Sequence, residues 1–167
     1  RHVVEKSTEN AELAFDLKHL FPAAKFIHIM RNPYANVVAI RRHHSQTSKR
    51  VNFKNRFPVL ITNLPALKNS YYHLYRNRRL FDEADYQVIR YEDLLTAPED
   101  TMRAVARFLS ILFTDGLLQP TSLGQPWQGN SSRGISFSGI SAKNMDLWRG
   151  EISNLELYYV NRYFKFV

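Results

Sequence analysis

The segment KFIHIMRNPYANVVAIRRHH, residues 25–44, places an arginine between a short apolar run and the expected start of a helix. The apolar run ends at Arg31, and Asn32-Pro33 is typical of an N-cap followed by the first helical residue. A helix N-terminus attracts anions through its free backbone N–H groups, and a guanidinium adds a charged fork of donors that matches a phosphate. The junction therefore indicates a bound phosphate.

Two further polar side chains lie at or just after the ends of strand-like runs. Lys6 follows a β-branched run that ends at Glu5, and Tyr91 closes the run YQVIRY. Ligands of open parallel sheets bind outside the carboxyl ends of the strands. We therefore expect strands ending at Glu5, Met30 and Tyr91 to lie parallel, with Lys6, Arg31 and Tyr91 at one edge.

The elements that must position these residues alternate between strand and helix. Strand patterns cover residues 2–5, 24–30 and 86–91. Helical patterns cover residues 9–21, 33–44, 57–83, 92–112 and 151–167, with a possible bend at Pro65. Polar connections remain at residues 45–55 and 114–144. This alternation predicts an α/β fold whose parallel sheet is covered by helices on both faces.

Charge is distributed unevenly along the 167 residues, whose net charge is +8. Between Leu17 and Phe81 there are 13 Lys and Arg residues and no Asp or Glu. Such a segregated field favours an anionic partner, namely a nucleotide, nucleic acid, sulfated sugar or membrane surface, while a merely solvated basic face stays open as the alternative.

Composition excludes several classes of protein. With 44% apolar residues the chain is long enough to bury one core. No apolar stretch is long enough to span a bilayer, and no signal-peptide pattern opens the sequence. Cysteine is absent, which excludes disulfides and thiolate metal sites, and His43-His44 has no acidic partner nearby. We expect a cytoplasmic protein without a metal.

Several motifs together resemble the sulfotransferase family that uses 3′-phosphoadenosine-5′-phosphosulfate (PAPS). They are VEKST, FPAAKFIHIMRNPYANVVAIRR, YQVIRYEDLLTAPEDTMRAVARFLSI, GNSSRG and LWRGEIS, in the family's order. The resemblance implies a three-layer α/β sandwich with a parallel sheet, the P-loop-NTPase-like sulfotransferase fold. It also implies transfer of a sulfonate from PAPS to a hydroxyl or amine acceptor, with release of 3′-phosphoadenosine-5′-phosphate (PAP).

The resemblance implies a role for each strand-end residue. Arg31 looks like the arginine that grips the 3′-phosphate, whose charge would also offset an arginine placed at the positive end of a helix dipole. The family usually has a serine eight residues later, where this chain has Ala39, so Arg41 or Arg42 would compensate or the donor would bind more weakly. Tyr91 matches a tyrosine that contacts the adenine, although an ordinary core aromatic stays open.

Further donor contacts are implied around the transferring group. Lys6 matches a lysine that lies beside that group, where it would neutralise developing charge as a catalytic residue. The loop GNSSRGISFSGISAK resembles the late loop that closes over the donor. It contributes the expected cofactor-binding residues Ser131, Ser132, Arg133 and Lys143.

One element of the family is missing from the sequence. It is the glycine-rich strand–loop–helix that cradles the 5′-phosphosulfate. We therefore expect residues 1–167 to form one domain, the C-terminal part of a catalytic domain whose acceptor is unidentified. Two alternatives remain, a basic nucleic-acid binding module and another nucleotide-phosphate transferase.

Overall fold

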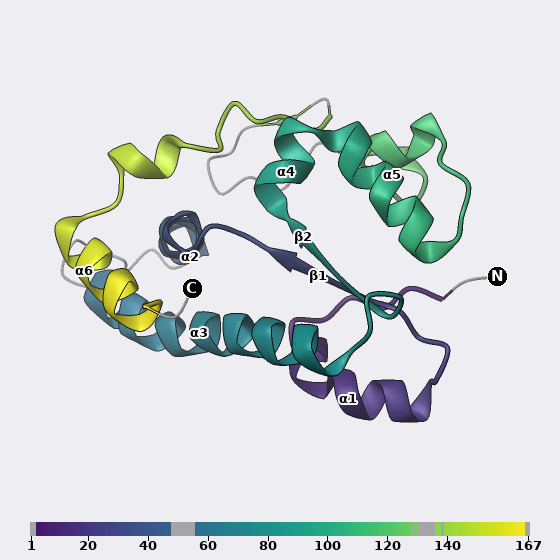
Figure 1. Cartoon of the computed structure of the whole chain (residues 1–167). Coiled ribbons are helices and arrows are strands. Elements are labelled where there is room, and N and C mark those ends of the chain that lie inside the picture. Colours follow the sequence, from purple (N-terminus) through teal and green to yellow (C-terminus); the bar gives the residue numbers. More distant parts are fainter. Residues whose placement is uncertain (1–2, 48–55, 128, 130–135, 138, 166–167) are drawn as a thin grey trace.

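The computed structural model describes residues 3–47, 56–127, 129, 136–137 and 139–165. Its main elements alternate between helix and strand, as Figure 1 shows. In chain order they are α1 (Asn10–Leu20), β1 (Phe26–Met30), α2 (Pro33–Thr47), α3 (Arg56–Leu80), β2 (Tyr86–Arg90), α4 (Tyr91–Thr96), α5 (Pro98–Leu109) and α6 (Asn154–Tyr163). Between α5 and α6 lie the short helices η2 (Asp115–Leu118) and η3 (Leu147–Gly150) and the ribbon of β3 (Thr121–Ser122) with β4 (Gln125–Pro126).

The two longer strands form a parallel pair. β1 and β2 align from Phe26 opposite Tyr86 to Met30 opposite Arg90. In Figure 1, α1 and α3 lie on one side of this pair and α4 and α5 on the other. The expected α/β fold with a parallel sheet is confirmed.

The strand expected to end at Glu5 is wrong. Residues 3–7 are neither helix nor strand, and the parallel sheet of the described residues contains only β1 and β2. Val3 and Val4 are 96% and 89% exposed. A β-branched run becomes a strand only where a neighbouring backbone pairs with it, and no such neighbour meets these residues.

Two other boundaries differ from the sequence patterns. α2 extends to Thr47, beyond the expected end near His44, because no glycine or proline follows to stop it. α3 continues through Pro65 as one helix.

On β1, Ile27 and Ile29 are 36% and 58% exposed, so one face of this strand is largely open.

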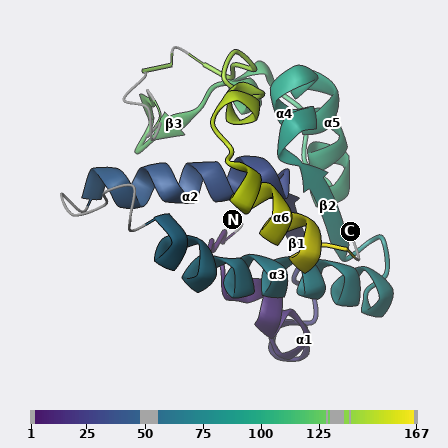
Figure 2. The same ribbon diagram turned by 90° about the vertical axis from the view of Figure 1, so that its left-hand side faces the viewer.

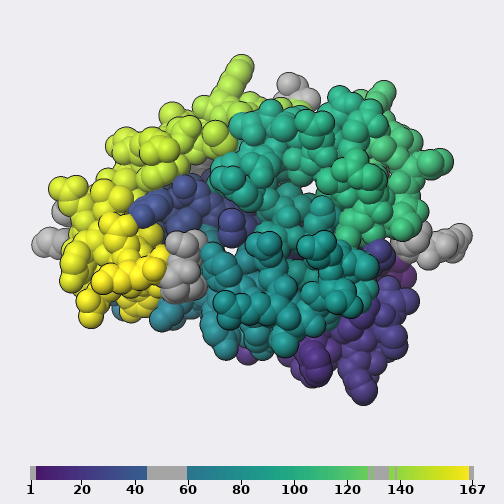
Figure 3. Space-filling model, in the orientation of Figure 1, coloured from purple at the N-terminus to yellow at the C-terminus, as the bar shows by residue number. Residues whose placement is uncertain are grey.

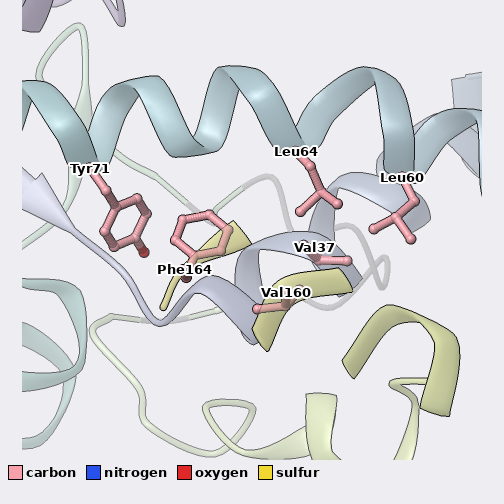
Figure 4. Packing of buried hydrophobic residues seen from close by; sticks show 6 residues of the cluster. All are labelled: Val37, Leu60, Leu64, Tyr71, Val160 and Phe164. Carbon is pink, nitrogen blue, oxygen red and sulfur yellow. The ribbon is translucent and has the colours of Figure 1, made fainter. Parts of the chain in front are cut away.

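A core of apolar side chains holds α2, α3 and α6 together. Figure 2 shows α6 crossing in front of α2 and α3. The core residues drawn in Figure 4 are Val37, Leu60, Leu64, Tyr71, Val160 and Phe164. Leu64 and Val160 are fully buried. Because α2 contributes to this core, its orientation is set by the last helix of the chain.

A buried ion pair joins α2 to α6. The Arg41 guanidinium donates to Oε2 of Glu156 at 2.9 Å and to the carbonyl of Glu151 at 2.9 Å. Glu156 also completes a capping box with Ser153 at the start of α6. The next arginine, Arg42, pairs with the side chain of Glu151 nearer the surface.

We expect Arg41→Met to lower the free energy of unfolding by about 3–5 kcal/mol, because it leaves the Glu156 carboxylate buried without its cation. The matched Arg42→Met should cost about 1 kcal/mol or less, because that pair is more exposed to solvent. Urea unfolding of both variants measures the difference. Equal losses would show that Arg41–Glu156 does not anchor α6.

Two buried tyrosine hydroxyls differ in their partners. The Tyr86 hydroxyl is hydrogen-bonded to Nδ1 of His28 at 2.9 Å, whereas the buried Tyr71 hydroxyl has no hydrogen-bond partner among the described residues. Tyr86→Phe should therefore cost about 1 kcal/mol of stability, whereas Tyr71→Phe should be neutral or stabilising by up to about 1 kcal/mol. Denaturant unfolding compares them, and a larger loss for Tyr71→Phe would contradict the assignment.

Stability should fall below neutral pH because of two histidines. Burial, and then the neighbouring His73, lower the pKa of His28 from its ordinary 6.5. Burial, and then Arg76, lower the pKa of His73, which Glu12 partly opposes. The unfolded chain therefore binds more protons, so this contribution is complete above about pH 6.5 and is lost as the pH falls.

Urea unfolding between about pH 7.5 and 5.5 tests this expectation. His73→Gln should flatten the pH profile, whereas His43→Gln, at an exposed position, should leave it unchanged. Stability that rises on acidification would contradict it.

Candidate functional site

Arg31 and Tyr91 meet at the carboxyl edge of the sheet. Because Met30 is opposite Arg90 in the parallel register, the next residue of each strand emerges at the same level. The Arg31 guanidinium lies over the Tyr91 ring, 4.9 Å from its centroid. The expected juxtaposition of these two residues is confirmed.

The backbone N–H groups at the N-terminus of α2 have acceptors within the protein. The Asn32 side chain accepts from the N–H groups of Tyr34 and Ala35 at 2.9 and 3.2 Å, as expected of an N-cap. Pro33 has no N–H, and the N–H of Asn32 donates to Oε1 of Glu92 at 2.9 Å. The free N–H groups expected here are not found, because those of Asn32, Tyr34 and Ala35 already have acceptors within the protein. Arg31 is left as the donor at this junction.

A cavity of about 930 Å³ opens beside this pair. Its polar wall includes Arg31, Asn36 and Arg42, whereas Tyr91, Leu94 and Met102 line it from α4 and α5. Figure 3 shows the yellow-green segment before α6, and α6 itself, flanking the blue surface of α2. The segment between α5 and α6 closes the cavity with Leu117, Pro120, Trp127, Phe137, Met145 and Trp148.

The arginines that follow Ala39 have different surroundings. Ala39 lines the cavity, as does Arg42. Arg41 does not line the cavity, and its guanidinium is paired with Glu156. Arg41 therefore cannot replace the serine that the resemblance led us to expect. Arg42 combines a place on the wall with an ion pair to Glu151.

Two of the remaining expected site residues, Lys6 and Lys143, do not line the cavity. Lys6 is exposed, lies outside the cavity wall and does not follow a strand. Lys143 is also exposed and off the wall, although Ser141 and Asn144 line it. Ser131, Ser132 and Arg133 lie outside the described residues.

Three residues of the site were missed by sequence reasoning. Trp127 and Trp148 both line the cavity. Trp148 stacks on Tyr34 with ring centroids 5.3 Å apart and planes 11° apart, and Trp127 is 46% exposed. The third is Glu92, whose bond to the N–H of Asn32 spans 60 residues of sequence. No local pattern identifies a contact of that kind.

The described residues contain neither a cluster of metal ligands nor a membrane-spanning helix. These residues contain no group of three or more His, Cys, Asp or Glu side chains arranged to hold a metal ion. Within the same part of the chain, no helix is long and apolar enough to cross a membrane.

The matches to curated relatives cover only a limited part of each relative's length. The omega-hydroxy-beta-dihydromenaquinone-9 sulfotransferase Stf3 of Mycobacterium bovis is 32% identical over 99 residues. The match covers 57% of this chain and 25% of that protein, and the Mycobacterium tuberculosis protein of the same name matches equally. The chain thus spans about a quarter of these relatives.

Solved structures with the same fold cover nearly the whole chain. A sulfotransferase domain from the curacin biosynthetic pathway superposes with a TM-score of 0.66 at 21% identity, over 99% of this chain and 62% of its own. The sulfotransferase domain of the Synechococcus PCC 7002 olefin synthase gives 0.67 at 21% identity, over 99% and 58%. These likenesses show the sulfotransferase fold.

The match to a family model is the most direct evidence of kinship. The model described as "Sulfotransferase family" matches residues 1–115, which include β1, α2, β2, α4 and α5. The matched part thus contains both Arg31 and Tyr91. Neither a nucleic-acid module nor another phosphate transferase is favoured by any of these comparisons. The chain belongs to the sulfotransferase family.

Proposed function

We propose that this chain forms part of an enzyme that transfers a sulfonate from PAPS to a hydroxyl or amine, and that its cavity receives the donor nucleotide. The observation that carries the proposal is that the Arg31 guanidinium stacks on Tyr91 at the carboxyl ends of β1 and β2, beside the cavity. Within the described residues, no carboxylate forms an ion pair with Arg31. A permanently charged, half-buried group without an internal partner favours an external anion.

Arg31 would hold the 3′-phosphate of the donor. Because the α2 N-terminus has no N–H to spare, recognition there depends on the guanidinium alone. Its planar fork can donate two parallel hydrogen bonds to a phosphate, which an ammonium cannot. Arg42, further along α2, would add positive potential from the wall, and Ala39 leaves out one hydroxyl donor.

The adenine would occupy the apolar and aromatic part of the cavity. Tyr91 is fixed against Arg31, and Leu94, Trp127 and Phe137 offer apolar and aromatic wall nearby. A planar base is suited to such a wall because stacking tolerates any π-face. Ser131, Ser132, Arg133 and Lys143 remain proposed contacts of the late loop.

The transfer itself needs positioning more than covalent catalysis. The acceptor oxygen or nitrogen attacks the sulfur, and the bond from sulfur to the bridging phosphate oxygen breaks. PAP departs with that electron pair, and the proton of the acceptor passes to a base or to water. Fixed positive charge that faces the departing nucleotide stabilises the charge that develops on it. Lys6 remains a proposed contributor near the transferring group, at an exposed position away from the Arg31 cavity.

We also propose that residues 1–167 form one domain, the C-terminal part of the catalytic domain. One continuous superposition covers 99% of this chain but 62% of the curacin sulfotransferase domain. The 5′-phosphosulfate would then bind a segment that corresponds to the part of such domains that this chain does not cover.

Replacing Arg31 tests the donor assignment. In the intact protein, Arg31→Ala should weaken PAP binding by about 2–3 kcal/mol, the usual worth of a bidentate charged contact. Arg31→Lys should recover only part of the loss. Adenosine 5′-phosphosulfate lacks the 3′-phosphate, so its affinity should hardly change. Calorimetric titration with both nucleotides measures this.

Arg90→Ala is the matched control, because Arg90 ends β2 beside Tyr91 but is exposed and off the cavity wall. It should leave both affinities unchanged. If Arg31→Ala lowered the affinities for both nucleotides equally, the assignment of the 3′-phosphate to Arg31 would be wrong.

A further inference from the structure

The N-terminus of the helix that follows Arg31 is hydrogen-bonded to an anion that the protein itself supplies from α4. Oε1 of Glu92 accepts the N–H of Asn32 at 2.9 Å, at the positive end of the α2 dipole. The other N–H groups of this turn bond to Asn32. Glu92 therefore occupies the backbone donor that an incoming phosphate would otherwise take.

The same hydrogen bond connects the two strand-end motifs. Glu92 follows Tyr91 in the first turn of α4, and Asn32 follows Arg31. One bond between these neighbours therefore constrains how the turn after β1 lies against the turn after β2. The Arg31 guanidinium and the Tyr91 ring, 4.9 Å apart, are the side chains that this constraint aligns.

A buried phenol lies behind this arrangement. Tyr71 of α3 is 4% exposed, and its hydroxyl has no hydrogen-bond partner although the Asn36 side chain lies beside it. Burial, and then the negative charge of Glu92, raise the pKa of Tyr71, whereas Arg31 opposes the rise. Glu92 and Arg31 thus act on one enclosed region of low polarity, where a displaced carboxylate would be costly.

We propose that Glu92 is a positioning residue for 3′-phosphate recognition: it acts through the N–H of Asn32 to hold Arg31 in its place over Tyr91. The inference rests on the proposed function, since it assumes that Arg31 binds that phosphate. Glu92 itself does not line the cavity. Its removal should therefore affect discrimination between nucleotides more than general nucleotide binding.

The experiment compares Glu92→Met with Glu92→Gln in the intact protein. The two replacements are similar in length, but only glutamine keeps an oxygen that can accept the Asn32 N–H. PAP and adenosine 5′-monophosphate differ by the 3′-phosphate, so the ratio of their calorimetric affinities measures its recognition. Glu92→Met should reduce that ratio about tenfold, as a small misplacement of a binding group does, and Glu92→Gln should keep it within about threefold.

Asp93→Asn is the control, because Asp93 is a neighbouring acid of α4 that pairs with Arg90 on the surface. It should leave the ratio unchanged. Thermal unfolding of each variant separates stability from recognition, since a merely structural role would lower the melting temperature and leave the ratio intact. Protection of the Asn32 amide against hydrogen exchange in the unmutated protein provides a second test, and rapid exchange there would overturn the proposal.

The possible failures are distinguishable. If the unmutated protein does not prefer PAP to adenosine 5′-monophosphate, the proposed function is wrong and this inference falls with it. If the unmutated protein prefers PAP and Glu92→Met retains the ratio, only the role of Glu92 is overturned.

Discussion

The parallel pairing of β1 with β2 is the constraint on which the site depends. Parallel strands in register bring their carboxyl ends to one level, so the residues that follow Met30 and Arg90 must lie side by side. Arg31 and Tyr91 obtain their contact from that alignment, although 60 positions separate them in sequence. The chemistry of the edge is thus a consequence of backbone pairing that involves neither side chain.

A second constraint fixes the helix that leaves this edge. α2 packs into the core with α3 and α6, and the buried Arg41–Glu156 pair sets its rotation. Since successive residues of a helix point about 100° apart, burying Arg41 turns Arg42 toward the cavity. The C-terminal helix therefore determines which arginine faces a ligand.

Electrostatics at the α2 N-terminus explains how an arginine is tolerated there. A cation opposes the helix dipole, but Glu92 places a carboxylate on the Asn32 N–H and offsets it. Its bond also uses up the backbone donor. Under the proposed function, a phosphate would then be recognised by the Arg31 guanidinium, whose planar fork of donors differs from a simple point charge.

The sequence by itself determined the elements around Arg31, because Asn32-Pro33 and apolar runs of fixed period are local signals. Its motifs together also indicated the sulfotransferase family, by resemblance. Only the tertiary structure decided the partners: Glu92 for the Asn32 N–H, and Glu156 rather than a ligand for Arg41. It also decided that the run before Lys6 is no strand. Each of these outcomes depends on a neighbour that is remote in the chain or missing, and no local pattern encodes such a neighbour.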